Sequence, residues 1–306
     1  MRITLRQLEV FAAVADAGST TAAGERIALS QSATSAALKE LEAELGVALF
    51  DRIGTRLVLN DTGRAVLSQA RIVLDGAAAI EREFGPAGRE GGAAMASLRV
   101  GASTTIGNYL LPELIASWQH AWPGAQVEVK VANTAEIASA VARLEVDIAF
   151  IEGPAHEPDV RLEPWRDDEL VIVASSGHPL LADGPRRLGV AALRSVDWLL
   201  REPGSGTREA VEQALLPYLQ QPREGLQFGG TEAIKQAAAH GLGFACLSIA
   251  TVRDQIALGR LVRVETTLPR LVRPLFLASH RRKRFSPSLE RFVTHCRMAQ
   301  ASSSAS

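Results

Sequence analysis

The stretch that most constrains the fold runs from residue 19 to residue 42, because it predicts two short helices separated by a tight turn. Ser19 and Ser30 each precede a predicted helix, and a serine hydroxyl there can accept a hydrogen bond from the free N–H groups of the first turn. Leu29 is an apolar anchor inside the turn. At 100° per residue, one side of the second helix is apolar. That side carries Ala33, Ala37, Leu38, Leu41 and Leu45, and the opposite side carries Gln31, Ser32, Ser35 and Lys39.

The polar side of this second helix has chemistry that suits the reading of base edges. Its first side chains are uncharged and both donate and accept hydrogen bonds, as the N-terminal residues of a recognition helix in a major groove must do. An ordinary amphipathic helix pair with a solvated polar face explains the same pattern, because this spacing is common. Thr34 lies toward the apolar side, so we expect it to pack. The pattern alone leaves both interpretations open.

Five segments around this pair follow one another in a characteristic order. They are Leu5-Arg6-Gln7-Leu8 with Phe11, the Ala22-Ala23 pair, residues 29–35, residues 41–46, and Leu49-Phe50-Asp51-Arg52. Together they resemble the N-terminus of LysR-type transcriptional regulators, and the resemblance continues through the whole chain. It implies a winged helix-turn-helix domain over residues 1–60 that binds double-stranded promoter DNA. Two positions depart from the family: Ala36 often is Arg there, and Ser32 often is Pro, which puts the operator sequence in doubt.

Residues 51–59 predict a small hairpin around a glycine-containing turn, which in a winged helix is the wing. Arg52 and Arg56 are placed there to reach phosphates or a minor groove. Residues 1–60 carry six basic and seven acidic side chains, so bulk charge gives no support to DNA binding. We therefore expect modest non-specific affinity and a need for dimeric binding. The predicted DNA-binding residues are Gln31, Ser32, Ser35, Lys39, Arg52 and Arg56.

Residues 61–84 predict one long helix that Asn60 can cap. Apolar side chains recur along it with heptad spacing, at Val66, Ala70, Val73, Ala77, Ile80 and Phe84. An apolar stripe of this length must be buried against another surface. The resemblance implies an antiparallel helix from a second subunit, hence a homodimer and, by family expectation, a homotetramer. Packing on its own domain is the alternative.

The glycine-rich residues 85–97 predict a hinge between domains. From Leu98 onward predicted strands and helices alternate, which indicates parallel sheets covered by helices. We expect two α/β lobes, the first over about 98–169 and 270–300 and the second over about 170–269. The resemblance implies that residues 98–300 are a two-lobed effector-binding domain similar to type 2 periplasmic binding proteins. The predicted fold class is thus α/β with a helix-rich N-terminal winged helix-turn-helix.

Three polar loops follow predicted strands, at residues 103–105, 204–207 and 229–232. Ligands of open α/β sheets bind in this position, and hydroxyls with free N–H groups at helix N-termini favour an anion. The resemblance implies that these loops line the effector cleft, although each Ser or Thr alone is as well explained as a helix cap. The predicted effector-binding residues are Ser103, Thr104, Ser205, Thr207 and Thr231. Arg201 and Arg208 either add positive charge there or lie on the surface.

The effector class stays open between a small oxyanion and a carboxylate. Residues 103–112 and 201–208 resemble those of LysR members that control sulfur metabolism or carbon dioxide fixation.

Other functions find little support in the sequence. It has no P-loop, HExxH motif or dinucleotide fingerprint, and Gly101-Ala102-Ser103 lacks the second Gly of a nucleophile elbow. Its six histidines are scattered, and Cys246 and Cys296 form no CxxC pair, so we expect no enzyme, catalytic residue, metal or cofactor. Cys246 lies in an apolar run and is expected to be a buried hydrophobe. A redox-sensing role for it is the alternative.

The sequence also contains no apolar run of about 18 residues and no secretory pattern, which predicts a cytoplasmic protein without a membrane segment. The alternative to a DNA-binding regulator is a small-solute-binding module that acts without DNA. That alternative leaves residues 19–56 unexplained.

Overall fold

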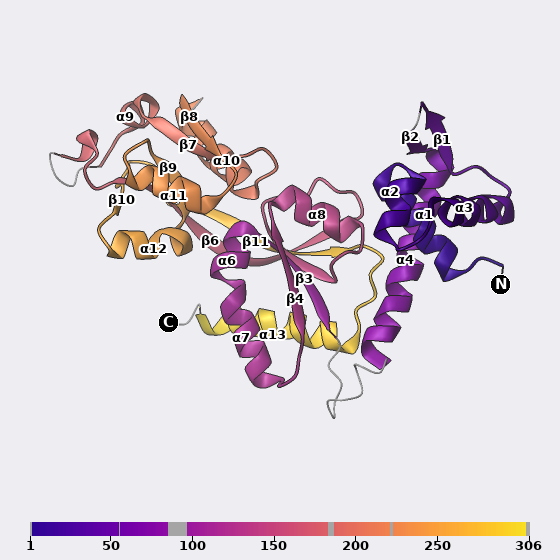
Figure 1. Cartoon of the computed structure of the whole chain (residues 1–306). Helices are drawn as coiled ribbons and strands as arrows, with labels where there is room; N and C mark the ends of the chain where they lie inside the picture. The colour runs from indigo at the N-terminus through magenta and orange to yellow at the C-terminus, as the bar shows by residue number, and fades with distance from the viewer. Residues whose placement is uncertain (1, 55, 85–96, 183–186, 221–222, 304–306) are drawn as a thin grey trace. The chain divides into compact units, whose positions relative to one another are not determined.

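The computed structural model describes residues 2–54, 56–84, 97–182, 187–220 and 223–303. The chain forms two compact units, Met1–Ala96 and Ser97–Ser306 (Figure 1). Most of the predicted hinge at 85–97 lies outside the described residues.

The N-terminal unit is a helix-turn-helix followed by a wing and a long helix. Its elements are α1 (Leu5–Ala17), α2 (Thr20–Arg26), α3 (Gln31–Leu45), β1 (Phe50–Ile53), β2 (Arg56–Leu59) and α4 (Asp61–Phe84). Ser19 and Ser30 accept hydrogen bonds from the backbone N–H groups of Ala22 and Ala33, each at 3.2 Å. Both predicted caps are therefore confirmed.

The core of this unit fixes α3 against α1 and the wing. Phe11, Leu41 and Leu49 are fully buried, and Phe11 packs edge-on against Phe50 of β1. Thr34 is fully buried, and its hydroxyl donates to the Ser30 carbonyl at 2.9 Å. The predicted packing role of Thr34 is confirmed, and the opposite face of α3 is left to solvent.

Helix α4 buries only part of its apolar stripe within its own unit. Asn60 Oδ1 accepts from the Gly63 N–H at 2.8 Å and caps the helix as predicted. Ala70 is buried in the domain core, but the Val73 side chain is 48% exposed and that of Ile80 63%. Apolar surface of this kind along a helix requires another partner.

The first lobe of the C-terminal unit is built on one mixed sheet. Its strands are β3 (Leu98–Ser103), β4 (Val127–Ala132), β5 (Ile148–Glu152), β6 (Val160–Ser175) and β11 (Leu271–His280), in the order β4-β3-β5-β11-β6. Strands β3, β4 and β5 are parallel, whereas β11 runs antiparallel to β5 and β6. The parallel arrangement predicted from the alternation is confirmed for β3, β4 and β5, and the antiparallel β11 brings the chain back near residue 270, as expected, after β6 has carried it into the second lobe.

The helices of this lobe are α6 (Thr104–Tyr109), α7 (Leu111–Ala121), α8 (Thr134–Ala142) and α13 (Pro287–Ser303). Helices α6 and α7 are separate, and Pro112 lies in the first turn of α7. Proline cannot donate the N–H bond that a continuous helix would need there. Helix α13 continues to Ser303.

The second lobe combines strands at one end of the same seven-stranded sheet with a separate two-stranded parallel sheet, β7-β8. Its elements are η1 (Pro179–Leu181), α9 (Val190–Ser195), β7 (Asp197–Arg201), α10 (Gly206–Leu219), β8 (Arg223–Phe228), α11 (Thr231–Ala239), β9 (Ala245–Ser248), α12 (Ile249–Ala257) and β10 (Leu261–Arg263). Strands β9 and β10 pair with the second half of β6, and a Trp198–Phe244 bridge joins β7 to the chain entering β9. Strands β6 and β11 thus belong to both lobes.

Cys246 is buried in the second lobe, as predicted. Burial raises the pKa of its thiol to about 12, so the thiol stays protonated and unreactive. Among the described residues, no helix is both long and apolar enough to cross a membrane.

Candidate functional site

A polar hollow of about 340 Å³ lies between the helix-turn-helix and the wing. It is lined by Ser19, Thr20, Thr21, Gln31, Ser35, Arg52, Gly54, Arg56 and Leu57. Four of the six predicted DNA-binding residues, Gln31, Ser35, Arg52 and Arg56, therefore share one surface. Ser32 and Lys39 are exposed on α3 but do not line the hollow.

The three predicted DNA-binding cations lie on α3 and the wing. Arg52, Arg56 and Lys39 are exposed and have no hydrogen-bond or ion-pair partner within the described part of the chain. In the wing, Arg52 is paired with Leu57 and Ile53 with Arg56, so the two arginines project from opposite faces of the hairpin near its tip. Both arginines nevertheless line the hollow.

Polar side chains of α3 are held near its first turn. The Gln31 side chain donates to Thr20 Oγ1 at 3.2 Å, and the hydroxyls of Ser30 and Ser32 lie 3.0 Å apart. These contacts fix the orientation of groups that can read base edges.

The three predicted effector loops do follow strands in the C-terminal unit. Strand β3 ends at Ser103, β7 at Arg201 and β8 at Phe228, and the loops lead into α6, α10 and α11. Ser103, Thr207 and Thr231 are each less than 5% exposed. The loops therefore form a buried polar centre.

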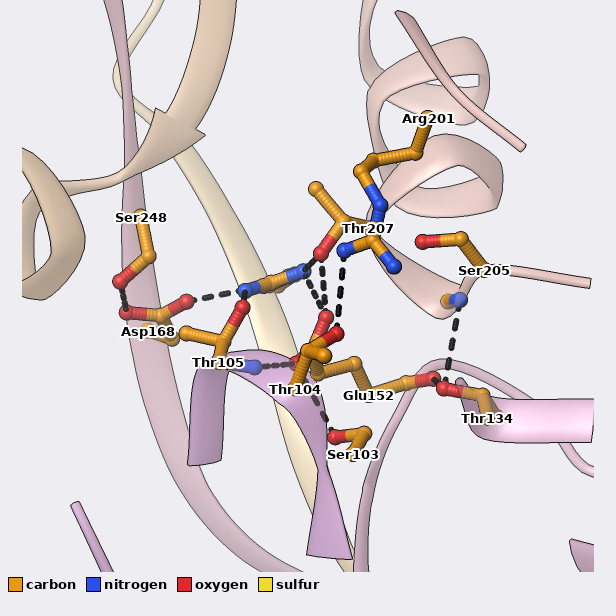
Figure 2. A network of polar contacts seen from close by, with 12 residues as sticks. Ser103, Thr104, Thr105, Thr134, Glu152, Asp168, Arg201, Ser205, Thr207 and Ser248 are labelled. Atoms are coloured by element: carbon orange, nitrogen blue, oxygen red, sulfur yellow. Dashed lines mark hydrogen bonds and ion pairs between the residues drawn. The ribbon is translucent and has the colours of Figure 1, made fainter. Parts of the chain in front are cut away.

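At this centre, hydrogen-bond donors converge on the carboxylate of Glu152, the last residue of β5 (Figure 2). Its Oε1 accepts from the Ser103 hydroxyl and the Thr105 N–H, each at 3.0 Å. Its Oε2 accepts from Thr207 Oγ1 and from Arg273 Nη1, the latter at 2.8 Å. Sequence reasoning missed both Glu152 and Arg273.

The Glu152 carboxylate is fully buried and still ionised. Burial alone would raise its pKa, but the Arg273 charge and the hydrogen bonds it accepts outweigh burial and lower the pKa. Arg273 Nε also donates to Asp168 Oδ2 at 2.8 Å, and Asp168 accepts from Ser248. The buried centre is thus a satisfied network on the crossing strands β6 and β11.

Arg201 forms a second polar centre beside the first. Its Nη1 donates to Thr104 Oγ1 and Thr231 Oγ1, each at 3.0 Å, while Nε and Nη2 pair with Glu202. The residue is 2% exposed, so the interpretation of Arg201 as a surface residue is wrong. Arg208 instead binds Glu212 and Glu224 and joins α10 to β8.

The alternative interpretation of the five predicted effector residues was that each is a helix cap. Only one of the five side chains caps a helix. Ser205 Oγ accepts from the Arg208 N–H at 3.5 Å and caps α10. The hydroxyls of Ser103 and Thr207 bind Glu152, and those of Thr104 and Thr231 bind Arg201.

The two lobes touch directly at this centre. The Thr134 hydroxyl of lobe one donates to the Glu152 carbonyl at 3.1 Å and accepts from the Gly206 N–H of lobe two at 3.2 Å. A Cβ atom at Gly206 would lie 1.9 Å from the Glu152 carbonyl oxygen, so only glycine permits this approach. In the described residues no group of three or more His, Cys, Asp or Glu side chains is placed to hold a metal ion.

Two family models match this chain and together span nearly all of it. "Bacterial regulatory helix-turn-helix protein, lysR family" matches residues 5–64, and "LysR substrate binding domain" matches residues 91–301. The chain belongs to the LysR family of transcriptional regulators. It is therefore a DNA-binding regulator of transcription with a C-terminal effector-binding domain, in a family of regulators rather than enzymes.

Similar proteins agree with this assignment over the full length. The HTH-type transcriptional regulator YeiE of Escherichia coli K12 is 48% identical over 296 residues, which cover 97% of this chain and 98% of YeiE. The RuBisCO operon transcriptional regulator of Allochromatium vinosum is 34% identical over 292 residues, 95% of each chain.

Two solved LysR structures are similar to this chain, one over nearly its full length and one over about two thirds of it. A full-length OxyR variant from Pseudomonas aeruginosa matches with a TM-score of 0.70 at 26% identity, covering 98% of this chain and 95% of that one. The regulatory domain of CcmR from Synechocystis, in complex with 2-PG, matches with a TM-score of 0.60 at 30% identity, covering 67% and 97%.

Proposed function

We propose that this LysR-type regulator binds a pseudo-palindromic promoter site through the polar hollow and that a small anion in the cleft controls this binding. Control by an anion is supported above all by the convergence of hydrogen-bond donors on the Glu152 carboxylate. These donors form a site that fits a carboxylate-sized anion, and the Glu152 side chain occupies it. An oxyanion or carboxylate effector would take over these donors.

For DNA binding, we propose that α3 enters the major groove with Gln31, Ser32 and Ser35 nearest the bases. Lys39, Arg52 and Arg56 supply phosphate or minor-groove contacts. These three cations are exposed and form no hydrogen bond or ion pair within the described part of the chain. They are therefore available to exchange their counterions for DNA phosphates.

For assembly, we propose a homodimer through α4 and, from two such dimers, a homotetramer. An apolar groove of about 550 Å³ runs beside α4, between its first half and the start of α1. Val66, Ala70 and Val73 of the heptad stripe line it together with Leu5 and Leu45. The α4 helix of a second copy supplies an apolar stripe of matching length. Dimerisation doubles the DNA contact that one weakly charged domain can make.

For domain organisation, we propose residues 1–60 as the DNA-binding domain, 61–84 as the dimerisation helix, 85–97 as the hinge and 98–300 as the effector-binding domain. Its lobes cover about 98–169 with 270–300, and 170–269. The protein would act in the cytoplasm, where promoter DNA is found.

For the effector, we propose that Ser103, Thr104, Thr207 and Thr231 provide hydroxyls, with Ser205 holding the first turn of α10. Arg201 and Arg273 supply the charge. The CcmR regulatory domain was solved in complex with 2-PG, and its match to this domain supports a small ligand for this domain.

The DNA proposal is tested by fluorescence anisotropy of the full chain on its own upstream DNA and on scrambled DNA across a salt series. Wild type should prefer the upstream fragment, and a Ser35→Ala/Arg52→Ala double variant should lose that preference. Equal, weak binding to both DNAs with and without candidate effectors would favour the solute-binding module that acts without DNA.

The effector proposal is tested by isothermal titration calorimetry with sulfur and phosphorus oxyanions, bicarbonate and short carboxylates. Binding should weaken in Thr104→Val, which keeps the side-chain shape but removes the hydroxyl. The matched control is Thr294→Val, since among the described residues the Thr294 hydroxyl binds only the Glu290 carbonyl on α13. Equal affinities for the two variants would place the anion elsewhere.

A further inference from the structure

Three side chains join the two lobes a short way beyond the effector loops. Tyr109 is the last residue of α6, and Glu232 and Lys235 lie in the first two turns of α11. The Tyr109 hydroxyl donates to Glu232 Oε1 and accepts from Lys235 Nζ at 2.7 Å. Lys235 Nζ also donates to Glu232 Oε1 at 2.8 Å. We call this cluster of Tyr109, Glu232 and Lys235 the latch.

The latch depends on a buried charge. The Lys235 side chain is only 7% exposed, whereas that of Glu232 is 59% exposed. The Lys235 ammonium lies 5.0 Å from the centre of the Tyr109 ring. An ammonium withdrawn from water is stable only where hydrogen bonds and opposite charge replace its hydration, and a ring face adds further attraction. Tyr109 is the member from lobe one, and it supplies both the hydroxyl and the ring.

The latch lies on α6 and α11, two of the three helices that follow the effector loops. Helix α6 begins at Thr104 and α11 begins at Thr231, and the Arg201 guanidinium bridges these two threonines. Thr231 and Lys235 are four residues apart on α11 and so lie on one face of it. Arg201 therefore joins the two helices at their first residues, and the latch joins them again farther along.

We propose that Tyr109, Glu232 and Lys235 hold the lobes closed in the absence of an effector, and that this latch sets the fraction of molecules whose anion site is assembled. An effector that draws Arg201 away from Thr104 and Thr231 leaves the latch to hold α6 against α11. This inference deepens the proposed function, because it names the residues that control closure of the same cleft. Only the link between the latch and effector affinity rests on the proposed function. Affinity scales with the closed fraction, since residues of both lobes build the site.

The test measures the distance between the lobes of the full chain without any ligand, by double electron–electron resonance. Spin labels are attached to cysteines introduced at Ala116 on α7 and Gln213 on α10, both exposed. The native Cys246 and Cys296 are buried with thiol pKa values raised to about 12, so labelling is directed to the introduced positions. Tyr109→Phe keeps the ring but removes both hydroxyl hydrogen bonds. Because these bonds involve charged partners, we expect the open-to-closed ratio to rise about tenfold.

The chain offers a matched control in its only other tyrosine. The Tyr218 hydroxyl makes no hydrogen bond among the described residues, so Tyr218→Phe should keep the wild-type distance distribution. Glu232→Gln serves as a second variant, because its exposed side chain places folding at little risk; it should shift the distribution in the same direction by a smaller amount.

Wild-type distances in both Tyr109→Phe and Glu232→Gln would overturn the latch, as would an equal shift in Tyr218→Phe. No DNA or anion enters this measurement. Refutation of the latch is therefore distinguishable from refutation of the proposed function, which the anisotropy and calorimetry experiments test.

Discussion

Replacing Gly206 with alanine should force apart the two lobes of the effector-binding domain at their closest contact. The added Cβ would lie 1.9 Å from the Glu152 carbonyl oxygen and 2.5 Å from Thr134 Oγ1. Real Cβ contacts are not shorter than 3.0 Å, so the two backbones must separate by about 1.1 Å. The carbonyl belongs to a buried strand and cannot turn aside as a flexible side chain would.

The loss of unfolding free energy can be worked out from the packing and the hydrogen bonds that this separation disturbs. Overpacking of a rigid contact costs about 1–3 kcal/mol. The Gly206 N–H bond to Thr134 and the Thr207 bond to Glu152 lie at the same contact and would lengthen as well, at about 1 kcal/mol each. We expect Gly206→Ala to lower the free energy of unfolding of this domain by about 3–5 kcal/mol.

The assay uses the distribution of tryptophans in the chain. All four, Trp118, Trp122, Trp165 and Trp198, lie in the C-terminal unit, so intrinsic fluorescence during urea unfolding reports on that unit alone. Gly229→Ala is the matched control, because a Cβ there meets nothing within 4 Å. If Gly206→Ala and Gly229→Ala unfolded at the same urea concentration, the rigid contact between the lobes would be refuted.

Three further predictions concern charge. Burial alone would raise the pKa of Asp147, but hydrogen bonds and charge from Arg99 and Lys283 lower it to about 2. Its stabilisation is therefore complete above the unfolded value near 4 and is lost as pH falls through 2. Wild type should lose about 2 kcal/mol of unfolding free energy over that window in urea titrations; an identical loss in Asp147→Asn would contradict this origin. Arg52→Ala and Arg56→Ala should each reduce the slope of log affinity against log salt by about 0.9 in anisotropy, if each contacts one phosphate, and an unchanged slope would exclude that contact. Glu152→Gln removes the internal anion while keeping its shape, so calorimetry should show several-fold tighter oxyanion binding; weaker binding would show that the carboxylate assists the ligand.

Much of the N-terminal unit could be predicted because its signals are local. Ser19, Ser30, Gly18 and Gly46 lie at the helix ends they define, and the observed φ angles of the two glycines, 68° and 70°, are those of left-handed helix caps. The hairpin and the Asn60 cap follow the same logic. Each depends on residues within a few positions of one another, so periodicity and capping chemistry suffice.

The effector centre could be predicted only in part because its charges come from distant strands. Glu152 and Arg273 are 121 positions apart, and no spacing rule relates them. The first half of β6 was missed because residues 163–168 read as polar, although their pairing with β11 makes them a strand. One signal was present: Arg273 interrupts the apolar run of β11, and a charge inside a buried strand needs a buried partner.

The most direct test of the central claim measures operator affinity by anisotropy with and without the anion identified by calorimetry. It compares wild type with Thr104→Val and Thr294→Val. We predict that the anion changes the operator affinity of wild type and Thr294→Val by at least about fivefold, and that Thr104→Val needs a higher anion concentration for the same change. An equal response in all three proteins would contradict control of DNA binding from this cleft.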